Sequence, residues 1–264
     1  MDTPAFPPVP QLFADAPLRE VRLPFPEREL SLLLLADPLS LIKDEPPASA
    51  AGEKPETASE VYWGDLWPAA LALSQALLDG TVWLPNGNLP ILELGCGSGL
   101  VTTCGALAAK GEAAFVASDF VDRSLRLAQA NAERNGAGKW VSTRRIDWRE
   151  KYPHRHRLIL AADVLYDADA GWQICGFLKQ ALEDEPHTEA RAIVVDPDRW
   201  SARNFYYTAQ EAGFNVRRFR RPVPFTSING PVRVEPLSGP ASDHERVGDM
   251  TIEAIFYELT RKDF

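Results

Sequence analysis

The apolar residues of the chain fall into short runs that are separated by glycine, proline and charged residues. Residues 91–94 form one such run, and a glycine-rich turn at 95–99 separates it from an alanine-rich stretch that ends at Lys110. A second apolar run, 113–117, leads to Asp119. Short apolar runs bounded by turn residues are typical of buried strands, and the stretch between them has the length of a helix. The pattern predicts strand, glycine turn, helix and strand, the first half of a nucleotide-binding α/β unit.

The alternation of helix-length and strand-length segments continues to the end of the chain. Helices are expected at 68–78, 123–135, 168–182 and 205–212, and strands at 140–145, 158–162, 192–195, 215–223 and 250–260. Regular alternation of this kind predicts an α/β fold with a doubly wound sheet. Residues 224–248 are rich in proline, glycine and charge, and we expect a loop that covers the site.

The first 60 residues have a different pattern. Residues 18–23 and 29–36 are strand-like runs on either side of Pro24 to Pro26, which predicts a two-stranded hairpin. Residues 1–17 are rich in proline and are expected to form an extended arm, and residues 44–60 hold no large apolar residue and are expected to be a flexible loop. We therefore divide the chain into an N-terminal β extension, 1–60, and a main domain, 61–264.

The glycine turn and the acid after it suit a nucleoside ligand. Glycine lets the backbone turn tightly and lets a ligand approach it, and the helix that follows presents unpaired N–H groups. Asp119 lies 119 − 99 = 20 residues after Gly99, close to the spacing expected of an acid that binds ribose hydroxyls. The glycines form G-x-G-x-G after Glu93, however, and not the G-x-G-x-x-G of dinucleotide-binding proteins.

Three motifs carry a resemblance to a known family. The E-x-G-x-G-x-G stretch that starts at Glu93 resembles motif I of the class I S-adenosylmethionine-dependent methyltransferases. The segment W-G-x-L-W-P-A-A-x-x-L from Trp63 and the D-x-x-Y from Asp163 are similar to segments of family 16, most of whose members modify lysine in proteins. The resemblance implies a seven-stranded Rossmann-like sheet of order 3-2-1-4-5-7-6, closed by an antiparallel pair of strands. It also implies S-adenosylmethionine as the cofactor and S-adenosylhomocysteine as the product.

The resemblance also assigns roles to residues of this chain. The residues expected to bind the cofactor are Trp67, Glu93, Gly95, Cys96, Gly97, Gly99, Asp119, Phe120, Asp147, Trp148 and Ala162. In this arrangement Asp147 would accept a hydrogen bond from the adenine amino group. Asp163 and Tyr166 are expected to be catalytic. The alternative is that Asp163 caps the next helix and Tyr166 only packs.

Methyl transfer to lysine constrains what Asp163 can do. The attacking amine must be neutral, whereas a lysine side chain has a pKa of about 10.4. Burial lowers that pKa and a nearby carboxylate raises it, so Asp163 suits orientation of the amine or the cofactor better than strong base catalysis. Tyr166 offers a ring face to the methylammonium product. The D-P-x-R segment from Asp196 is similar to the electron-transfer-flavoprotein branch of the family, which implies that Arg199 and Trp200 border the substrate opening.

Composition narrows the classes of partner. The chain of 264 residues has a net charge of −9, which argues against nucleic acid as a general partner. No apolar stretch reaches the roughly 20 residues of a membrane span, and the N-terminus has no secretory pattern, so we expect a cytoplasmic protein. Three cysteines without C-x-x-C spacing and four scattered histidines indicate no metal site. We expect a monomer or weak dimer.

The sequence therefore predicts N-methylation of a protein lysine, with a protein substrate as the main partner. The nearest alternative is N-methylation of a small amine or nitrogen heterocycle such as nicotinamide. A non-catalytic, cofactor-binding scaffold is an alternative from another class. An NAD-dependent dehydrogenase is more distant, because the glycine spacing is wrong and no hydride-transfer pair is evident.

Overall fold

The computed structural model describes residue 13 and residues 16–37, 62–85, 89–167, 169–184, 189–224, 235–236 and 251–262. The predicted loop 44–60 lies outside the described residues, as do most of the predicted arm 1–17 and most of the predicted loop 224–248.

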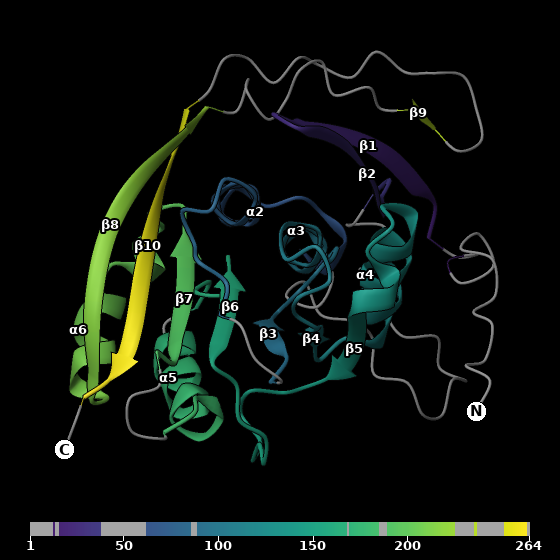
Figure 1. Cartoon of the computed structure of the whole chain (residues 1–264). Helices are drawn as coiled ribbons and strands as arrows, with labels where there is room; N and C mark the ends of the chain where they lie inside the picture. The colour runs from purple at the N-terminus through teal and green to yellow at the C-terminus, as the bar shows by residue number, and fades with distance from the viewer. Residues whose placement is uncertain are drawn as a thin grey trace, which may run out of the picture.

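One seven-stranded sheet organises the main domain (Figure 1). Its strands are β3 (Ile91–Leu94), β4 (Phe115–Asp119), β5 (Val141–Arg145), β6 (Leu158–Ala162), β7 (Arg191–Asp196), β8 (Phe214–Pro224) and β10 (Thr251–Arg261). The spatial order is β5-β4-β3-β6-β7-β10-β8. Strands β3 to β7 are parallel, and β10 runs antiparallel to both β7 and β8. Counted along the chain within the sheet, this is the predicted order 3-2-1-4-5-7-6.

Helices cover both faces of the sheet, which explains the uninterrupted apolar runs. Every residue of β3, β4, β6 and β7 is buried, as expected of parallel strands between helical layers. One layer holds α2 (Pro68–Leu78), α3 (Leu100–Ala108) and α4 (Asp122–Arg134), and the other holds α5 (Ala170–Ala181) and α6 (Phe205–Glu211). The fold is the α/β class that the sequence predicts.

Two helix boundaries differ from the prediction by two residues, for local reasons. Helix α3 ends at Ala108 because the chain turns into the left-handed region at Lys110 (φ 50°) and Gly111 (φ 92°). Helix α5 starts at Ala170, not at residue 168. The backbone N–H groups of Asp169 and Ala170 donate to Oδ1 of Asp167 (2.9 and 2.7 Å), which stabilises the new N-terminus.

The predicted hairpin is confirmed as β1 (Leu18–Phe25) and β2 (Arg28–Leu35), an antiparallel pair. The short strand β9 (Glu235–Pro236) pairs with the other edge of β1. Buried leucines of the hairpin belong to the same hydrophobic core as α2 and α3, so the hairpin packs as a further layer on this side of the molecule (Figure 1). The domain boundary at residue 61 stays a prediction.

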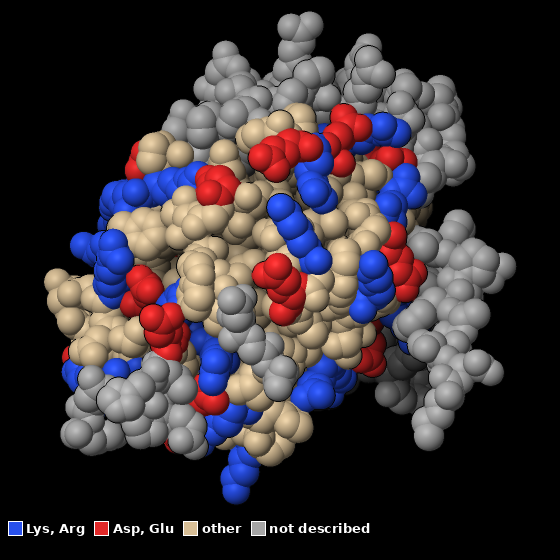
Figure 2. Space-filling view, in the orientation of Figure 1, with Lys and Arg blue, Asp and Glu red and all other residues tan. Residues whose placement is uncertain are grey.

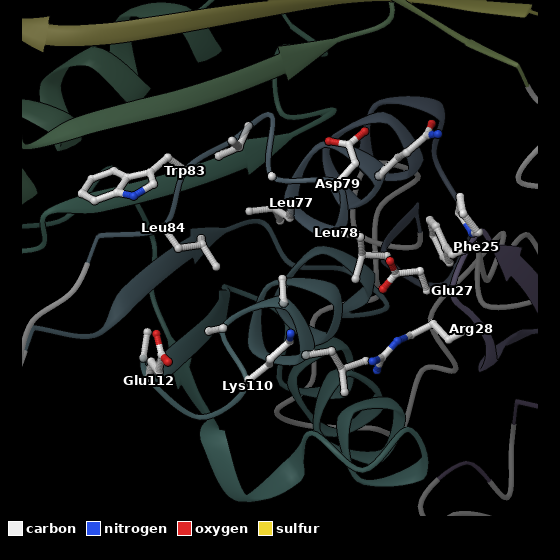
Figure 3. Close-up of a pocket in the computed structure, with 18 of the residues that line it drawn as sticks. Phe25, Glu27, Arg28, Leu77, Leu78, Asp79, Trp83, Leu84, Lys110 and Glu112 are labelled. Carbon is white, nitrogen blue, oxygen red and sulfur yellow. The ribbon is translucent and has the colours of Figure 1, made fainter.

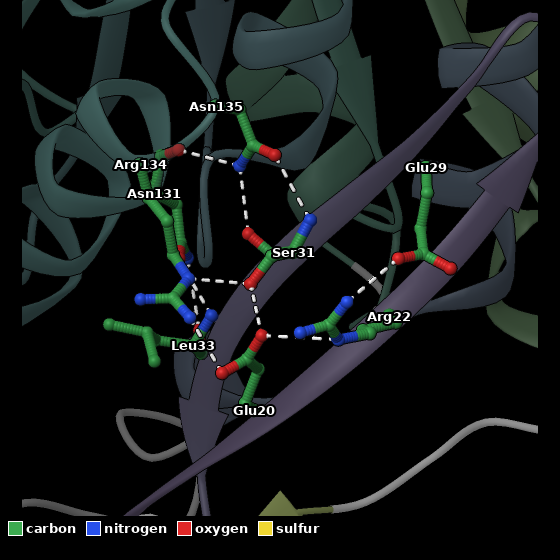
Figure 4. A network of polar contacts seen from close by, with 8 residues as sticks. All are labelled: Glu20, Arg22, Glu29, Ser31, Leu33, Asn131, Arg134 and Asn135. Atoms are coloured by element: carbon green, nitrogen blue, oxygen red, sulfur yellow. Dashed lines mark hydrogen bonds and ion pairs between the residues drawn. The ribbon is translucent and has the colours of Figure 1, made fainter.

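Two asparagines bind the free edge of β2: Asn131 in α4 and Asn135 directly after this helix (Figure 4). Asn131 accepts from the backbone N–H of Leu33 (2.7 Å) and donates to the Leu33 carbonyl (2.9 Å). Asn135 does the same for Ser31, at 3.0 and 2.8 Å. The carboxylate of Glu20, which pairs with Arg134 at 2.6 Å, adds a charged contact. These side-chain amides occupy the positions that a neighbouring strand would take.

Candidate active site

The carboxyl ends of β3, β4, β5 and β6 lie side by side at one edge of the sheet, where doubly wound folds bind their ligands. The glycine turn 95–99 follows β3, and Asp119 is the last residue of β4. Asp147 comes two residues after β5, and Asp163 directly after β6. The fold therefore brings the predicted acids and the glycine turn to one edge.

The glycine turn needs residues without a side chain. Gly97 has a φ of 49°, and a Cβ there would lie 3.1 Å from the backbone carbonyl of Trp63. Gly99, the N-cap of α3, has a φ of 77°, and a Cβ there would lie 2.6 Å from the Cβ of Ala128. Neither position can accept a larger residue without moving α4 or the segment around Trp63.

Glu93, in the strand before the glycine turn, supports the turn by binding the start of α3. Its buried carboxylate accepts from the backbone N–H of Thr102 (2.8 Å) and from the Thr102 hydroxyl, in the first turn of α3. Burial raises the pKa of Glu93 to about 8, against the hydrogen bonds from Thr102. Cys96 is also buried, and burial raises the pKa of its thiol well above the usual value. The contacts of both residues favour a role in shaping the turn.

Asp119 links the turn to the start of α4. Its Oδ2 accepts from the backbone N–H of Gly97 (3.1 Å) and the hydroxyl of Ser124 (2.8 Å), and its Oδ1 accepts from the backbone N–H of Val121 (3.1 Å). Burial raises the pKa of Asp119, and these hydrogen bonds oppose the rise. A ligand hydroxyl would share this carboxylate with these donors and with the backbone N–H of Phe120. Next to it, the carbonyl of Phe120 accepts from Nε of Arg145 (3.1 Å).

Ser124 is a supporting residue that the sequence analysis missed. Its side chain is fully buried, and its hydroxyl also lies 3.0 Å from the carbonyl of Gly97. The available signal was its place in the first turn of the helix that follows the acid, five residues after Asp119.

Asp147 and Trp148 form the wall on the β5 side. Arg149, which the sequence analysis did not single out, pairs with Asp147 through Nε to Oδ1 (2.8 Å) and Nη2 to Oδ2 (2.5 Å). These bonds lower the pKa of Asp147. A ligand amino group would therefore share this carboxylate with Arg149. The Trp148 indole donates to Oε1 of Gln173 (3.2 Å), which fixes the ring against α5.

Asp163 joins β6 to α2 and to β7. Its φ is 60°, an unusual value for an aspartate. Oδ2 accepts from the backbone N–H groups of Ala69 (2.7 Å) and Ala70 (3.2 Å) at the start of α2, and Oδ1 lies 3.1 Å from Nη2 of Arg199. Arg199 also pairs with the buried carboxylate of Asp196 at 2.8 Å. Burial raises the pKa of Asp163 to about 6, against the field of Arg199.

These contacts make Asp163 a cap of α2 and place Trp67, the N-cap residue of that helix, at the same edge. The Trp67 indole donates to the carbonyl of Tyr62 (2.8 Å), and the two rings meet edge to face at 5.6 Å. The catalytic role of Asp163 stays a prediction. Oδ2 is occupied by the N–H groups of α2, which favours positioning of α2, whereas Oδ1 lies at ion-pair distance from Arg199 without a hydrogen bond.

The aromatic residues beyond β6 and β7 are open to solvent. Tyr166 is 45% exposed and Trp200 is 81% exposed. Partial burial, followed by the charges of Asp167 and Asp119, raises the pKa of Tyr166, so its hydroxyl keeps its proton at neutral pH. Ala162, the last residue of β6, is buried and lies opposite Val195 of β7. Its backbone forms part of the base of the predicted site.

The groups at this edge fit S-adenosylmethionine. A Cβ on Gly95 would lie 3.0 Å from Cγ1 of Val164 and 3.5 Å from the Trp148 ring, so these two side chains face the backbone where a ligand would rest. The N-terminus of α3 supplies N–H donors, Asp119 suits a ribose, and Trp148 offers a flat surface to adenine. Within the described ranges, no group of three or more His, Cys, Asp or Glu side chains could hold a metal ion.

A separate cavity of about 620 Å³ lies away from these residues (Figure 3). It is lined by the hairpin turn and by the C-terminal ends of α2 and α3, with Trp83 and Lys110 among its walls. These segments lead into the amino ends of β3 and β4, so the cavity is at the edge of the sheet opposite the predicted site.

Comparisons with known proteins agree with the geometry. A family model described as Lysine methyltransferase matches residues 55–207, more than half of the chain. The electron transfer flavoprotein beta subunit lysine methyltransferase of Xenopus laevis is 28% identical over 191 residues, which are 69% of this chain and 68% of the relative.

Solved structures with a similar outline have low sequence identity. Precorrin 8w decarboxylase of Methanobacterium thermoautotrophicum has a TM-score of 0.48 and 19% identity, over 75% of this chain and 92% of that one. Fibrillarin of Aeropyrum pernix, solved with bound S-adenosyl-L-methionine, has a TM-score of 0.47 and 15% identity, over 72% and 76%. None of the helices that the structure describes is long and apolar enough to cross a membrane. With the family match, the strand order and the fitted edge together, the chain belongs to the lysine methyltransferase family and is an S-adenosylmethionine-dependent methyltransferase.

Proposed function

We propose that this enzyme methylates the side chain of a lysine in a protein acceptor. The observation that carries the proposal is the exposure of Tyr166 and Trp200, which follow the carboxyl ends of β6 and β7 and are 45% and 81% exposed. Exposed aromatic side chains can contact a lysine that is still attached to a folded protein, whereas a metabolite enzyme encloses its small acceptor. The family match and the relative from Xenopus laevis support the same acceptor class.

The cofactor supplies an electrophilic methyl group on sulfur, so the chain has to bind, orient and exclude water. Asp119 would accept hydrogen bonds from the ribose hydroxyls. Asp147 and Trp148 would hold the adenine, and the N-terminal N–H groups of α3 would face the methionine carboxylate. In-line transfer depends on such positioning more than on proton transfer.

The acceptor amine has to reach the site in its neutral form. The side chain of Asp163 is buried and already contacts the start of α2 and Arg199, which it shares with Asp196. We assign Asp163 to holding Trp67 and α2 against the cofactor. The neutral hydroxyl of Tyr166 is then the group that can accept a hydrogen bond from the amine, and its ring can face the methylated product.

The first acceptor to test is the beta subunit of electron transfer flavoprotein, which the name of the relative specifies. The purified enzyme would be incubated with S-adenosylmethionine labelled in the methyl group and with this subunit. A lysine-rich protein of unrelated fold and nicotinamide would be tested in parallel.

We expect label on a lysine of the subunit, located by mass spectrometry, and loss of the label with Asp119→Ala. Asp122→Ala is the matched control, because Asp122 lies three residues after Asp119, at the start of α4, and its side chain is 67% exposed. Label on nicotinamide and on no protein would overturn the proposal in favour of a small-amine methyltransferase. Binding of the cofactor without transfer to any acceptor would point to a scaffold.

A further inference from the structure

Strand β8 forms one edge of the main sheet and is the most basic segment of the described chain. It pairs with β10 along its whole length, and none of the described strands pairs with its other side. Residues 214–222 of β8 contain four arginines and no acid, in a chain whose net charge is −9. Figure 2 shows blue side chains gathered over the side where Figure 1 places β8. We call this free side of residues 214–222 the β8 edge.

The four arginines project to both faces of the sheet. Arg221 pairs with Asp79 at the end of α2, and Arg217, 78% exposed, lies 3.7 Å from Glu258. On the other face, the guanidinium of Arg218 lies 5.2 Å from the ring centre of Tyr206, and Arg220 pairs with Asp198 at 2.9 Å. Within the described part of the chain, Arg218 has no carboxylate in ion-pair contact.

The β8 edge leads to the proposed acceptor site. Arg220 lies opposite Ile255 of β10, and Ile255 lies opposite Asp196 at the end of β7. Asp196 shares Arg199 with Asp163, and the exposed Trp200 follows directly. Since neighbouring strands are about 4.8 Å apart, a segment added beside β8 would run about 19 Å from β6. Residues that follow this added segment in the same partner would therefore be within reach of the site.

We propose that the β8 edge docks an extended, acidic segment of the protein acceptor as an additional strand. Backbone hydrogen bonds from the unpaired edge would supply affinity. Acidic side chains on alternate residues all project to one face of the added strand, where they would meet Arg218 and Arg220. The identity of the partner as the acceptor rests on the proposed function, whereas the docking itself does not. The opposing interpretation is that the arginines only prevent unwanted strand pairing.

The test is a binding measurement that needs no methyl transfer. Fluorescence anisotropy would follow a labelled 12-residue peptide of alternating Glu and Thr, at low salt, with the full-length enzyme. Three further probes separate the alternatives: the same peptide with Lys in place of Glu, the acidic peptide with alternate backbone nitrogens methylated, and a 12-nucleotide oligothymidine.

We expect the acidic peptide to bind, the N-methylated peptide to bind at least 10-fold more weakly, and the Lys peptide not to bind. The double variant Arg218→Glu/Arg220→Glu should weaken binding at least 10-fold, and Arg218→Gln/Arg220→Gln should weaken it less. Arg126→Glu, a charge reversal of half that size on the exposed side of α4, should leave it unchanged. Unaltered binding of S-adenosylhomocysteine would show that the variants are folded.

Several results would overturn the docking proposal. These are equal losses for Arg126→Glu and the β8 variant, equal binding of the N-methylated peptide, or tighter binding of the oligothymidine, which would indicate a nucleic-acid surface. The proposed function is tested separately, because it fails if the acceptor is not methylated even when the acidic peptide binds.

Discussion

The two halves of the sheet hold their acids in different ways. In the cofactor half, formed by β3, β4 and β5, Glu93 binds a residue nine positions away and Asp119 binds residues within 22 positions. In the acceptor half, formed by β6, β7, β10 and β8, Asp163 binds the start of α2, 94 positions earlier in the chain, and Arg199, 36 positions later. A cofactor site can therefore be encoded in one continuous stretch of sequence, whereas the acceptor site depends on the completed fold.

The strongest test of this difference is Asp163→Ala. The change removes the cap of α2 and leaves the half-buried guanidinium of Arg199 with one carboxylate in place of two. We expect a loss of about 3 kcal/mol in the free energy of unfolding, measured by urea denaturation at about pH 5, where the buried Asp163 still holds its proton. The control is Asp198→Ala, which removes an exposed ion pair with Arg220 and should cost under about 1 kcal/mol. Equal losses would remove the distinction between the two halves.

The pH dependence of stability sharpens the same point. The pKa of Asp163 in the folded protein is about 6, above the ordinary value of 3.8, so the folded state binds its proton more tightly than the unfolded state does. Its contribution to stability is therefore complete below about pH 4 and is lost as the pH rises through about 6. The loss is on the order of 3 kcal/mol, at about 1.4 kcal/mol for each pH unit that separates the two pKa values.

Asp163→Asn provides the comparison, because asparagine cannot titrate. We expect urea denaturation series from pH 4 to pH 7 to give a flatter dependence for this variant than for the natural protein. Parallel curves would mean that Asp163 does not titrate in this range.

In the cofactor half, Asp119→Ala should weaken ligand binding more than it lowers the stability of the fold. We expect S-adenosylhomocysteine to bind roughly 50-fold more weakly, or about 2 kcal/mol, because the carboxylate that accepts the ribose hydroxyls is gone. Calorimetric titration measures the change, with Asp122→Ala as the reference. Unchanged affinity would separate Asp119 from the ribose.

The smallest expected effect is that of Tyr166→Phe. Removal of the hydroxyl should lower kcat about 5-fold, close to 1 kcal/mol, through loss of one hydrogen bond to the acceptor amine. The affinity for S-adenosylhomocysteine should stay the same. Tyr207→Phe, at another exposed tyrosine, should change neither value, and a matching loss of kcat there would remove Tyr166 from the site.

The sequence predicts most of the fold, because apolar runs and breakers act locally. The strand order follows from the three motifs and their family resemblance, and the glycine turn with Asp119 is predicted by spacing alone. The partners of Asp163 could not be predicted, since nothing in the local pattern around residue 163 indicates the start of α2. Arg149 and Ser124 were missed for a different reason. Their roles depend on the direction of their side chains, and polar residues near a turn usually face solvent.

The amide ladder between α4 and β2 has a consequence in its repeat distances. Four residues of helix advance about 6 Å and two residues of strand about 6.6 Å, so the two elements nearly share a step. Asn135 meets Ser31 and Asn131 meets Leu33, and one step further Leu127 shares a buried cluster with Leu35. Helix α4 therefore contacts every second residue of β2, twice through an asparagine amide and once through the apolar side chain of Leu127. A slip of one residue in β2 would turn all three contacts to the wrong face.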